Sequence, residues 1–172
     1  DINGDGRVDI LEGNGWWEQP ANAAEGQTWT LHPFKFADAA AQMFAYDVDG
    51  DGLKDVITAW HCHLYGLVWY QQAKSSSGEI TWQQHVILPS KPDVNSSDLR
   101  ISQLHAFDLV DMNGDGLLDI LTGKRFWAHG PKGDAEPDAP AVVYWFELQR
   151  KAGQAPQFIP HLVDDDSGVG TQ

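Results

Sequence analysis

A nine-residue acidic pattern that occurs three times constrains this chain more than any other feature. It occupies residues 1–9, 47–55 and 111–119, and reads Asp-x-Asx-Gly-Asp-Gly-x-x-Asp each time. The glycines at positions 4 and 6 let the backbone turn tightly, so that oxygens at positions 1, 3, 5 and 9 can converge. Because Ca2+ binds about six to eight oxygens at roughly 2.3–2.6 Å, the pattern predicts a calcium loop in each copy.

The backbone carbonyl at position 7 would add a further oxygen to each loop. So many oxygen ligands packed together would repel one another without a cation. We therefore expect about three Ca2+ per chain. The predicted ligand residues are Asp1, Asn3, Asp5, Arg7 and Asp9; Asp47, Asp49, Asp51, Leu53 and Asp55; and Asp111, Asn113, Asp115, Leu117 and Asp119.

The EF-hand is the main alternative for these loops, because it begins with the same residues. It also needs a bidentate glutamate at position 12. Only the first copy has one, at Glu12, whereas Thr58 and Thr122 stand at that position in the other two. The run of residues after each loop is short and rich in β-branched side chains, which favours a strand over a helix.

Each acidic loop belongs to a longer unit. An aromatic strand is expected downstream at 16–19, 67–72 and 142–147, and strands at 43–46 and 106–110 precede the second and third loops. A last strand in each unit has the pattern aromatic-x-x-His, which ends at His32, His85 and His161. The sequence therefore predicts an all-β chain of β-propeller blades, each with four antiparallel strands and a calcium loop between strands one and two.

The expected blades span approximately 1–37, 38–98 and 99–172, and the first lacks its first strand. Three blades do not close a ring, so the chain is expected to be a fragment of a larger propeller. The remaining blades would come from the parent chain or from another copy. A β-sandwich with calcium loops is the alternative architecture.

The repeated acidic motif followed by an apolar strand resembles the FG-GAP/VCBS repeat family. Its integrin-like propellers carry calcium in the loop between the first and second strands of a blade. The resemblance covers nearly the whole chain, and segments 123–130 and 164–172 further resemble long secreted VCBS-repeat proteins of planctomycete-type bacteria. The Phe-Gly and Gly-Ala-Pro portions of integrin repeats are missing, so integrin-type adhesion does not carry over.

Composition narrows the class of protein further. A formal net charge of −14 argues against nucleic acid as a partner, because phosphates require a basic surface. No apolar run approaches the roughly 18–20 residues needed to cross a membrane. The single cysteine, Cys62, excludes an intrachain disulfide. Because calcium is plentiful outside the cytoplasm, we expect a secreted, extracellular or periplasmic location.

Two groups of residues are candidates for a functional site on the face opposite the acidic loops. The first contains His61, His63, His105, His129, Lys124 and Arg125. These histidines could hold an additional transition metal, or they could be partly buried and hydrogen-bonded without one. Trp60 and Trp127 form the second group, which we expect to bind a ligand, and residues 131–140 are expected to form a surface loop or lid.

The leading functional hypothesis is a non-enzymatic, calcium-stabilised module that binds or scaffolds saccharide or extracellular protein. The alternative is a propeller enzyme acting on sugars, of lyase or dehydratase type. In that case His61, His63 and His105, with His129, Lys124 and Arg125, would serve as base, metal ligands and anion stabilisers.

Overall fold

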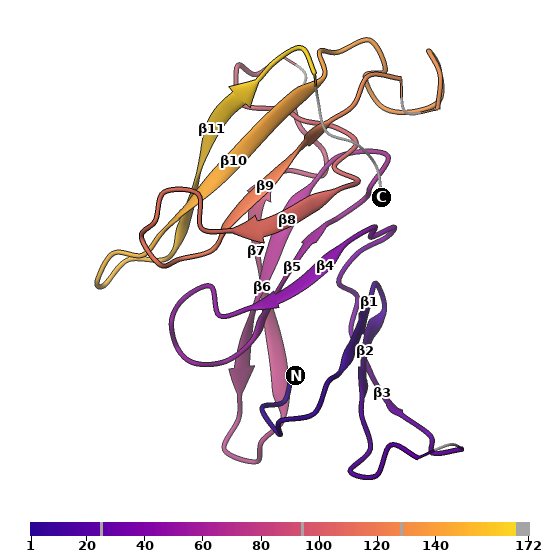
Figure 1. Cartoon of the computed structure of the whole chain (residues 1–172), viewed down its shortest axis with the longest axis vertical. Helices are drawn as coiled ribbons and strands as arrows, with labels where there is room; N and C mark the ends of the chain where they lie inside the picture. Colours follow the sequence, from indigo (N-terminus) through magenta and orange to yellow (C-terminus); the bar gives the residue numbers. More distant parts are fainter. Residues whose placement is uncertain (25, 94, 128, 168–172) are drawn as a thin grey trace.

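The computed structural model describes residues 1–24, 26–93, 95–127 and 129–167, and those residues form an all-β structure without helices (Figure 1). Eleven strands make three separate antiparallel sheets of three or four strands. This confirms the all-β prediction and agrees with the exclusion of the EF-hand, which requires helices. The segment 164–172, which resembles VCBS-repeat proteins in sequence, falls partly on residues 168–172, outside the described residues.

Each sheet is a meander in which strands adjacent in sequence are adjacent in space. Sheet 1 contains β1 (Ile10–Glu12), β2 (Gly15–Glu18) and β3 (Thr30–Pro33). Sheet 2 contains β4 (Met43–Tyr46), β5 (Asp55–Ala59), β6 (Leu67–Lys74) and β7 (Ile80–Leu88). Sheet 3 contains β8 (Phe107–Val110), β9 (Asp119–Lys124), β10 (Val142–Gln149) and β11 (Gln157–Asp164).

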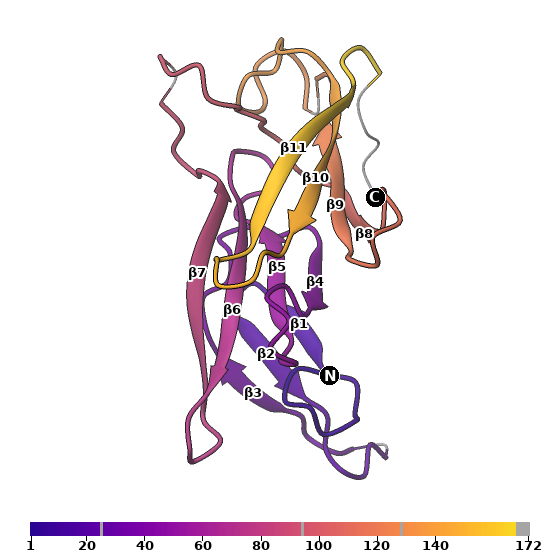
Figure 2. The ribbon, with the colours of Figure 1, turned by 90° about the vertical axis from the view of Figure 1, so that its left-hand side faces the viewer.

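Sheet 2 lies between the other two sheets, and both of its faces are buried (Figures 1 and 2). Every residue of β5 is buried, and its two polar side chains, Asp55 and Thr58, are hydrogen-bonded to the backbone of neighbouring segments. Alternate residues point to opposite faces of a strand. Accordingly, Ile57 packs into a core shared with sheet 3, whereas its neighbour Val56 packs with Trp16 and Phe36 of the sheet 1 region.

The histidine that ends each aromatic-x-x-His pattern packs in the same way in all three sheets. His32 stacks on Trp16 of the neighbouring strand, with ring centroids 4.1 Å apart and an angle of 7° between the rings. The His85–Trp69 and His161–Trp145 pairs repeat this stacking, with centroid distances of 4.2 and 4.3 Å. These histidines therefore support the sheets rather than form a separate site.

The acidic loops and the candidate histidines lie at opposite ends of sheets 2 and 3. Residues 47–54 lead into the start of β5, and residues 60–66 leave from its end. Likewise, residues 111–118 lead into β9, and residues 125–141 follow it (Figure 1). Connections at the two ends of one strand lie at opposite ends of the sheet. This is the separation expected from the sequence.

No closed ring of sheets forms in the part of the chain that the structure describes. Among the same residues there is also no helix with the length and apolar character needed to cross a membrane.

Candidate functional site

The three acidic loops share one backbone conformation. We name them loop 1 (residues 1–9), loop 2 (47–55) and loop 3 (111–119). In each, the carboxylate at position 1 accepts hydrogen bonds of 2.7–3.1 Å from the N–H groups of both glycines. The glycines have φ angles of 78–89°, which only glycine adopts at little cost. The side chain at position 5 accepts from the N–H at position 7, at 2.8–2.9 Å.

The aspartate at position 9 fixes each loop to its sheet. One oxygen of Asp119 accepts from Met112 N–H at 3.0 Å, and the other accepts from Leu148 N–H on β10 at 2.8 Å. Asp9 and Asp55 make the equivalent pairs of bonds, at 2.6–3.1 Å. Burial raises the pKa of Asp55 to about 6, although bonds from Gln72 and Val48 oppose the shift. A nearby cation would offset this cost of burying the charge.

The donor set of loop 2 fits a calcium ion. Ligand oxygens of Asp47, Asp49 and Asp55 lie within 4.8 Å of one another. Two oxygens on opposite sides of one Ca2+ lie about 4.8 Å apart, since each bond is roughly 2.4 Å. All of these donors are hard oxygens, which suit Ca2+, Mg2+ or Mn2+ rather than softer metals. Loops 1 and 3 have an asparagine oxygen at the position of Asp49.

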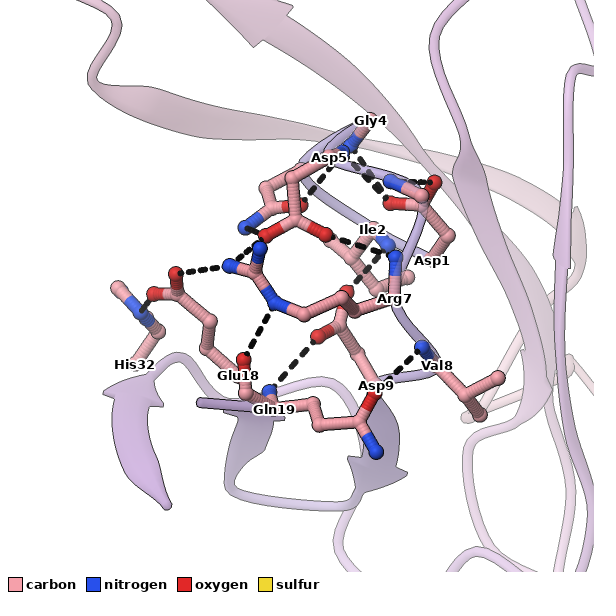
Figure 3. Close-up of polar contacts among 12 residues, drawn as sticks. Asp1, Ile2, Gly4, Asp5, Arg7, Val8, Asp9, Glu18, Gln19 and His32 are labelled. Atoms are coloured by element: carbon pink, nitrogen blue, oxygen red, sulfur yellow. Dashed lines mark hydrogen bonds and ion pairs between the residues drawn. The ribbon is translucent and has the colours of Figure 1, made fainter. Parts of the chain in front are cut away.

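Loop 1 differs from the others because its position 7 is an arginine (Figure 3). The guanidinium of Arg7 forms an ion pair with Asp5 and lies 3.6 Å from Glu18. Its Nε also donates to the Gln19 carbonyl at 2.9 Å. Glu18 in turn contacts His32 at 2.8 Å. A cationic side chain thus already lies beside the predicted calcium ligands of this loop.

Basic side chains from the next sheet hold loops 1 and 2. Lys74 of β6 donates to the Asn3 carbonyl of loop 1. Arg150, which follows β10, donates through Nε to the Val48 carbonyl of loop 2 at 2.7 Å and also bonds the Asp47 carbonyl. Lys74 and Arg150 occupy equivalent positions in their sheets. Lys74 lies two residues after Gln72, whose N–H donates to Asp55, and Arg150 lies two residues after Leu148, whose N–H donates to Asp119. The loops therefore tie neighbouring sheets together.

The four histidines predicted to gather at the other end do so. His61 and His63 come from the β5–β6 connection, His105 precedes β8, and His129 lies between β9 and β10. The ring of His63 is central, with centroid distances of 6.1 Å to His61, 5.5 Å to His105 and 4.6 Å to His129. We call these four residues the histidine cluster.

Asp134 joins this cluster and was missed from the sequence. Its side chain is only 5% exposed, and its oxygens lie 2.8 Å from His129 Nδ1 and 3.5 Å from His63 Nδ1. The segment around it is held by the Ala135 carbonyl, which accepts bonds of 2.9 Å from both Ser102 and Gln103. The sequence does contain a signal for it, because Asp134 follows His129 by five residues across a segment with two glycines, which can turn back on itself.

His105 and Cys62 lie beside the same cluster. Burial lowers the pKa of His105, as do the charges of His63, Arg125 and His129. Its Nδ1 is buried and has no hydrogen-bond partner among the described residues. Burial raises the pKa of the Cys62 thiol, and Asp134 adds to the effect. That favours an unreactive thiol.

Lys124 has a structural position rather than a ligand-facing one. It is 2% exposed, and its ammonium donates to the carbonyls of Arg125 at 3.0 Å and Ala139 at 3.1 Å. Burial lowers its pKa, against the opposing effect of Glu136 and two nearby aspartates. Lys124 thereby attaches the segment 131–140 to β9, which gives that segment the ordered contacts expected of a surface loop.

The two candidate tryptophans differ in exposure. Trp127 is 48% exposed, stacks on Phe126 with a centroid distance of 5.2 Å, and donates through Nε1 to Asp138 at 2.8 Å. Trp60, expected in an exposed connection, is instead partly buried and packs against the core that contains Phe36. The close approach of Gly66 to the Trp60 Cβ explains this packing. Trp127 is therefore the better placed of the two to meet a ligand.

The residues with unusual backbone conformations surround the histidine cluster. Among the described non-glycine residues, positive φ angles occur at Gln103 (63°), Trp127 (53°) and Glu136 (48°). Each lies two residues from His105, His129 or Asp134. Left-handed conformations at such residues cost roughly 1–2 kcal/mol and concentrate at functional sites. Their positions make this end of the molecule a candidate for a functional site.

A groove between sheet 1 and the β6–β7 hairpin is a third surface to consider. Its lining combines the rings of Trp16, Phe34 and Trp82 with the carboxylates of Glu18 and Glu79. Such a mixture of aromatic and polar groups is common in sites for small ligands.

Comparison with known proteins found no matching family model, no matching curated protein and no matching solved structure.

Proposed function

We propose that this chain is a calcium-binding segment of an FG-GAP/VCBS-type β-propeller, which acts outside the cytoplasm as a scaffold or binding module. The observation that supports this most strongly is the common conformation of loops 1, 2 and 3. Three separate segments place carboxylate or amide oxygens at the same positions and attach them to the sheet in the same way. Calcium would neutralise these oxygens and join each loop to two strands.

An exposed apolar row on the outer face of sheet 1 supports the propeller part of the proposal. Sheet 1 presents Ile10, Trp17 and Leu31 as one cross-strand row on the face away from sheet 2. Ile10 is 52% exposed and Leu31 is 40% exposed. An apolar row of this kind suits a further sheet, from the parent chain or from another copy.

The exposed rings of Phe126 and Trp127 support saccharide as a ligand. Sugar faces stack on aromatic rings, and Asp138 fixes the orientation of the indole. A protein partner could use the same surface, so a glycan screen with a Trp127→Ala control would separate the two ligand classes. Binding to glycans that is lost in Trp127→Ala supports saccharide, and binding that survives the change contradicts a role for this platform.

Calorimetric titration with Ca2+ and with Mg2+ tests the calcium proposal. We expect calcium binding to be reduced by one site in the double variant Asp111→Ala/Asp115→Ala. The matched control is Asp108→Ala, which removes an exposed acid on β8 close to loop 3 but outside it. Absence of calcium binding, or equal losses in the control and the loop variant, would overturn the proposal.

The convergence of the histidine cluster favours a second candidate, an enzyme acting on sugars of lyase or dehydratase type. The cluster offers imidazoles that can act as base or metal ligand next to an exposed aromatic surface. Sugar turnover that disappears in His105→Ala would support this function. Failure to convert any of a panel of acidic polysaccharides and keto sugars would argue for the binding module instead.

A further inference from the structure

We propose that His63, His129 and Asp134 form a binding site for one divalent transition-metal ion, separate from the three acidic loops. The ligand atoms of these residues lie within 4.8 Å of one another. The proposal does not depend on calcium binding, because the two kinds of site share no residue.

The distances suit a common ion. Ligands bound about 2.1 Å from a tetrahedral or octahedral metal lie roughly 3–3.5 Å from each other. Asp134 lies 3.5 Å from His63 Nδ1 and 2.8 Å from His129 Nδ1. The rings of His63 and His129 are 4.6 Å apart, so both can turn their nitrogens toward the same point beside the carboxylate.

Direct pairing of the histidines with Asp134 accounts for only one of the two contacts. His129 Nδ1 lies within hydrogen-bond distance of Asp134, at 2.8 Å, but the separation of 3.5 Å to His63 exceeds the usual range for a hydrogen bond from nitrogen, about 2.7–3.2 Å. The side chain of Asp134 is only 5% exposed, so its carboxylate oxygens require partners within the protein. A single cation between the three groups would contact the carboxylate and both imidazoles at once.

The ligand types select the class of metal. Two imidazoles and one carboxylate favour zinc, iron, nickel or copper over calcium. The side chain of His129 is 53% exposed and that of His63 is 34% exposed, so one side of the site faces solvent. Three protein ligands with an open side are typical of metals that also bind water or an oxygen ligand of a substrate.

The surrounding backbone holds the ligands in place before any ion binds. The Ala135 carbonyl fixes the position of Asp134 through Ser102 and Gln103. A Cβ at Gly133 would collide with the backbone oxygen and Cβ of His129, so the turn requires glycine there. Sites held by such contacts need less rearrangement on binding.

A competing ligand set shares His63. Cys62, His63 and His105 also place their ligand atoms within 4.8 Å of one another. The set of His63, His129 and Asp134 is favoured because the buried side chain of Asp134 lies close to both imidazoles and because His129 is open to solvent. Substitution of Cys62 distinguishes the two ligand sets.

The test is a titration of the chelator-treated protein with Zn2+ or Co2+ in saturating Ca2+, which keeps the acidic loops occupied. We expect one equivalent to bind, with affinity lowered roughly 100-fold or more in His63→Ala, His129→Ala and Asp134→Ala. Cys62→Ser and the distant His161→Ala should bind as the unaltered chain does. The Co2+ complex should lack the near-ultraviolet charge-transfer band of a thiolate ligand.

A thermal melt of each variant in Ca2+ separates loss of the ligand from loss of the fold. A variant that melts normally and has lost the metal supports the site. The proposal is overturned if no stoichiometric metal binds, if normally melting His129→Ala and Asp134→Ala variants bind it unchanged, or if Cys62→Ser abolishes binding.

Discussion

Loop 1 and loop 3 have nearly the same sequence and the same backbone hydrogen bonds, but their charge environments differ. In loop 1 the guanidinium of Arg7 pairs with Asp5, whereas the equivalent residue of loop 3 is the uncharged Leu117. The backbone bonds from the glycines to Asp1 and Asp111 have matching lengths of 2.7–3.0 Å. The glycines and aspartates therefore set the conformation of the loop, while the residue at position 7 determines whether one of its carboxylates is already paired with a cationic side chain.

Removal of calcium should produce the largest effect. If each ion binds at about 100 times its Kd, chelation removes roughly 2.7 kcal/mol of stability per site, or several degrees of Tm. Sheet 3 should lose more than sheet 1, because the Arg7–Asp5 ion pair of loop 1 would remain after chelation. Hydrogen exchange with and without chelator measures this, and equal loss of protection in both sheets would break the comparison.

Substitution of the position 9 aspartate should rank second. Asp119 is fully buried and accepts two backbone N–H groups, so Asp119→Ala should cost about 3 kcal/mol of unfolding free energy. Asp9 is only partly buried, and Asp9→Ala should cost about 1 kcal/mol. Denaturant unfolding in the presence of a calcium chelator gives both values without a contribution from bound Ca2+, and a larger loss for Asp9→Ala would reverse the expected order.

Exchange of position 7 between the loops tests the comparison directly. Arg7→Leu should raise the calcium affinity of loop 1 about tenfold, and Leu117→Arg should lower that of loop 3 by a similar factor, each equivalent to about 1.4 kcal/mol. Calcium titrations of both single variants and of the double variant measure the change. Unchanged affinities would mean that the Arg7–Asp5 pair does not compete with the ion.

The contacts between sheets should contribute the smallest effects. Arg150→Ala removes two bonds to carbonyls of loop 2 and should cost about 1 kcal/mol. Lys74→Ala removes a more exposed contact to loop 1 and should cost less than about 1 kcal/mol. Thermal melts of both variants provide the test, and a greater loss for Lys74→Ala would contradict this ranking.

Local patterns predicted much of this structure. The strand at β5 follows from a short β-branched run, and β3, β7 and β11 follow from the aromatic-x-x-His pattern that recurs in each unit. The gathering of His63 and His129 could also be predicted, because connections at the same end of neighbouring sheets come together. These features depend on residues near one another in sequence or on repeat position.

Features that depend on contacts between distant segments could not be predicted. Asp134 enters the histidine cluster because its turn is held by Ser102 and Gln103, more than thirty residues away. Trp60 is partly buried because it packs against the core that contains Trp16 and Phe36, which periodicity does not reveal. That the sheets belong to a larger ring, and that the ligand is saccharide or protein, remain predictions.

The most direct test of calcium binding is to count the ions bound per chain, by native mass spectrometry across a range of free Ca2+ concentrations. We predict three Ca2+ per chain, with the loop 1 site filling last and the Arg7→Leu variant filling all three over a narrower range. A chain that binds no Ca2+ stoichiometrically at millimolar concentrations, while still folded, would contradict the calcium assignment of all three loops.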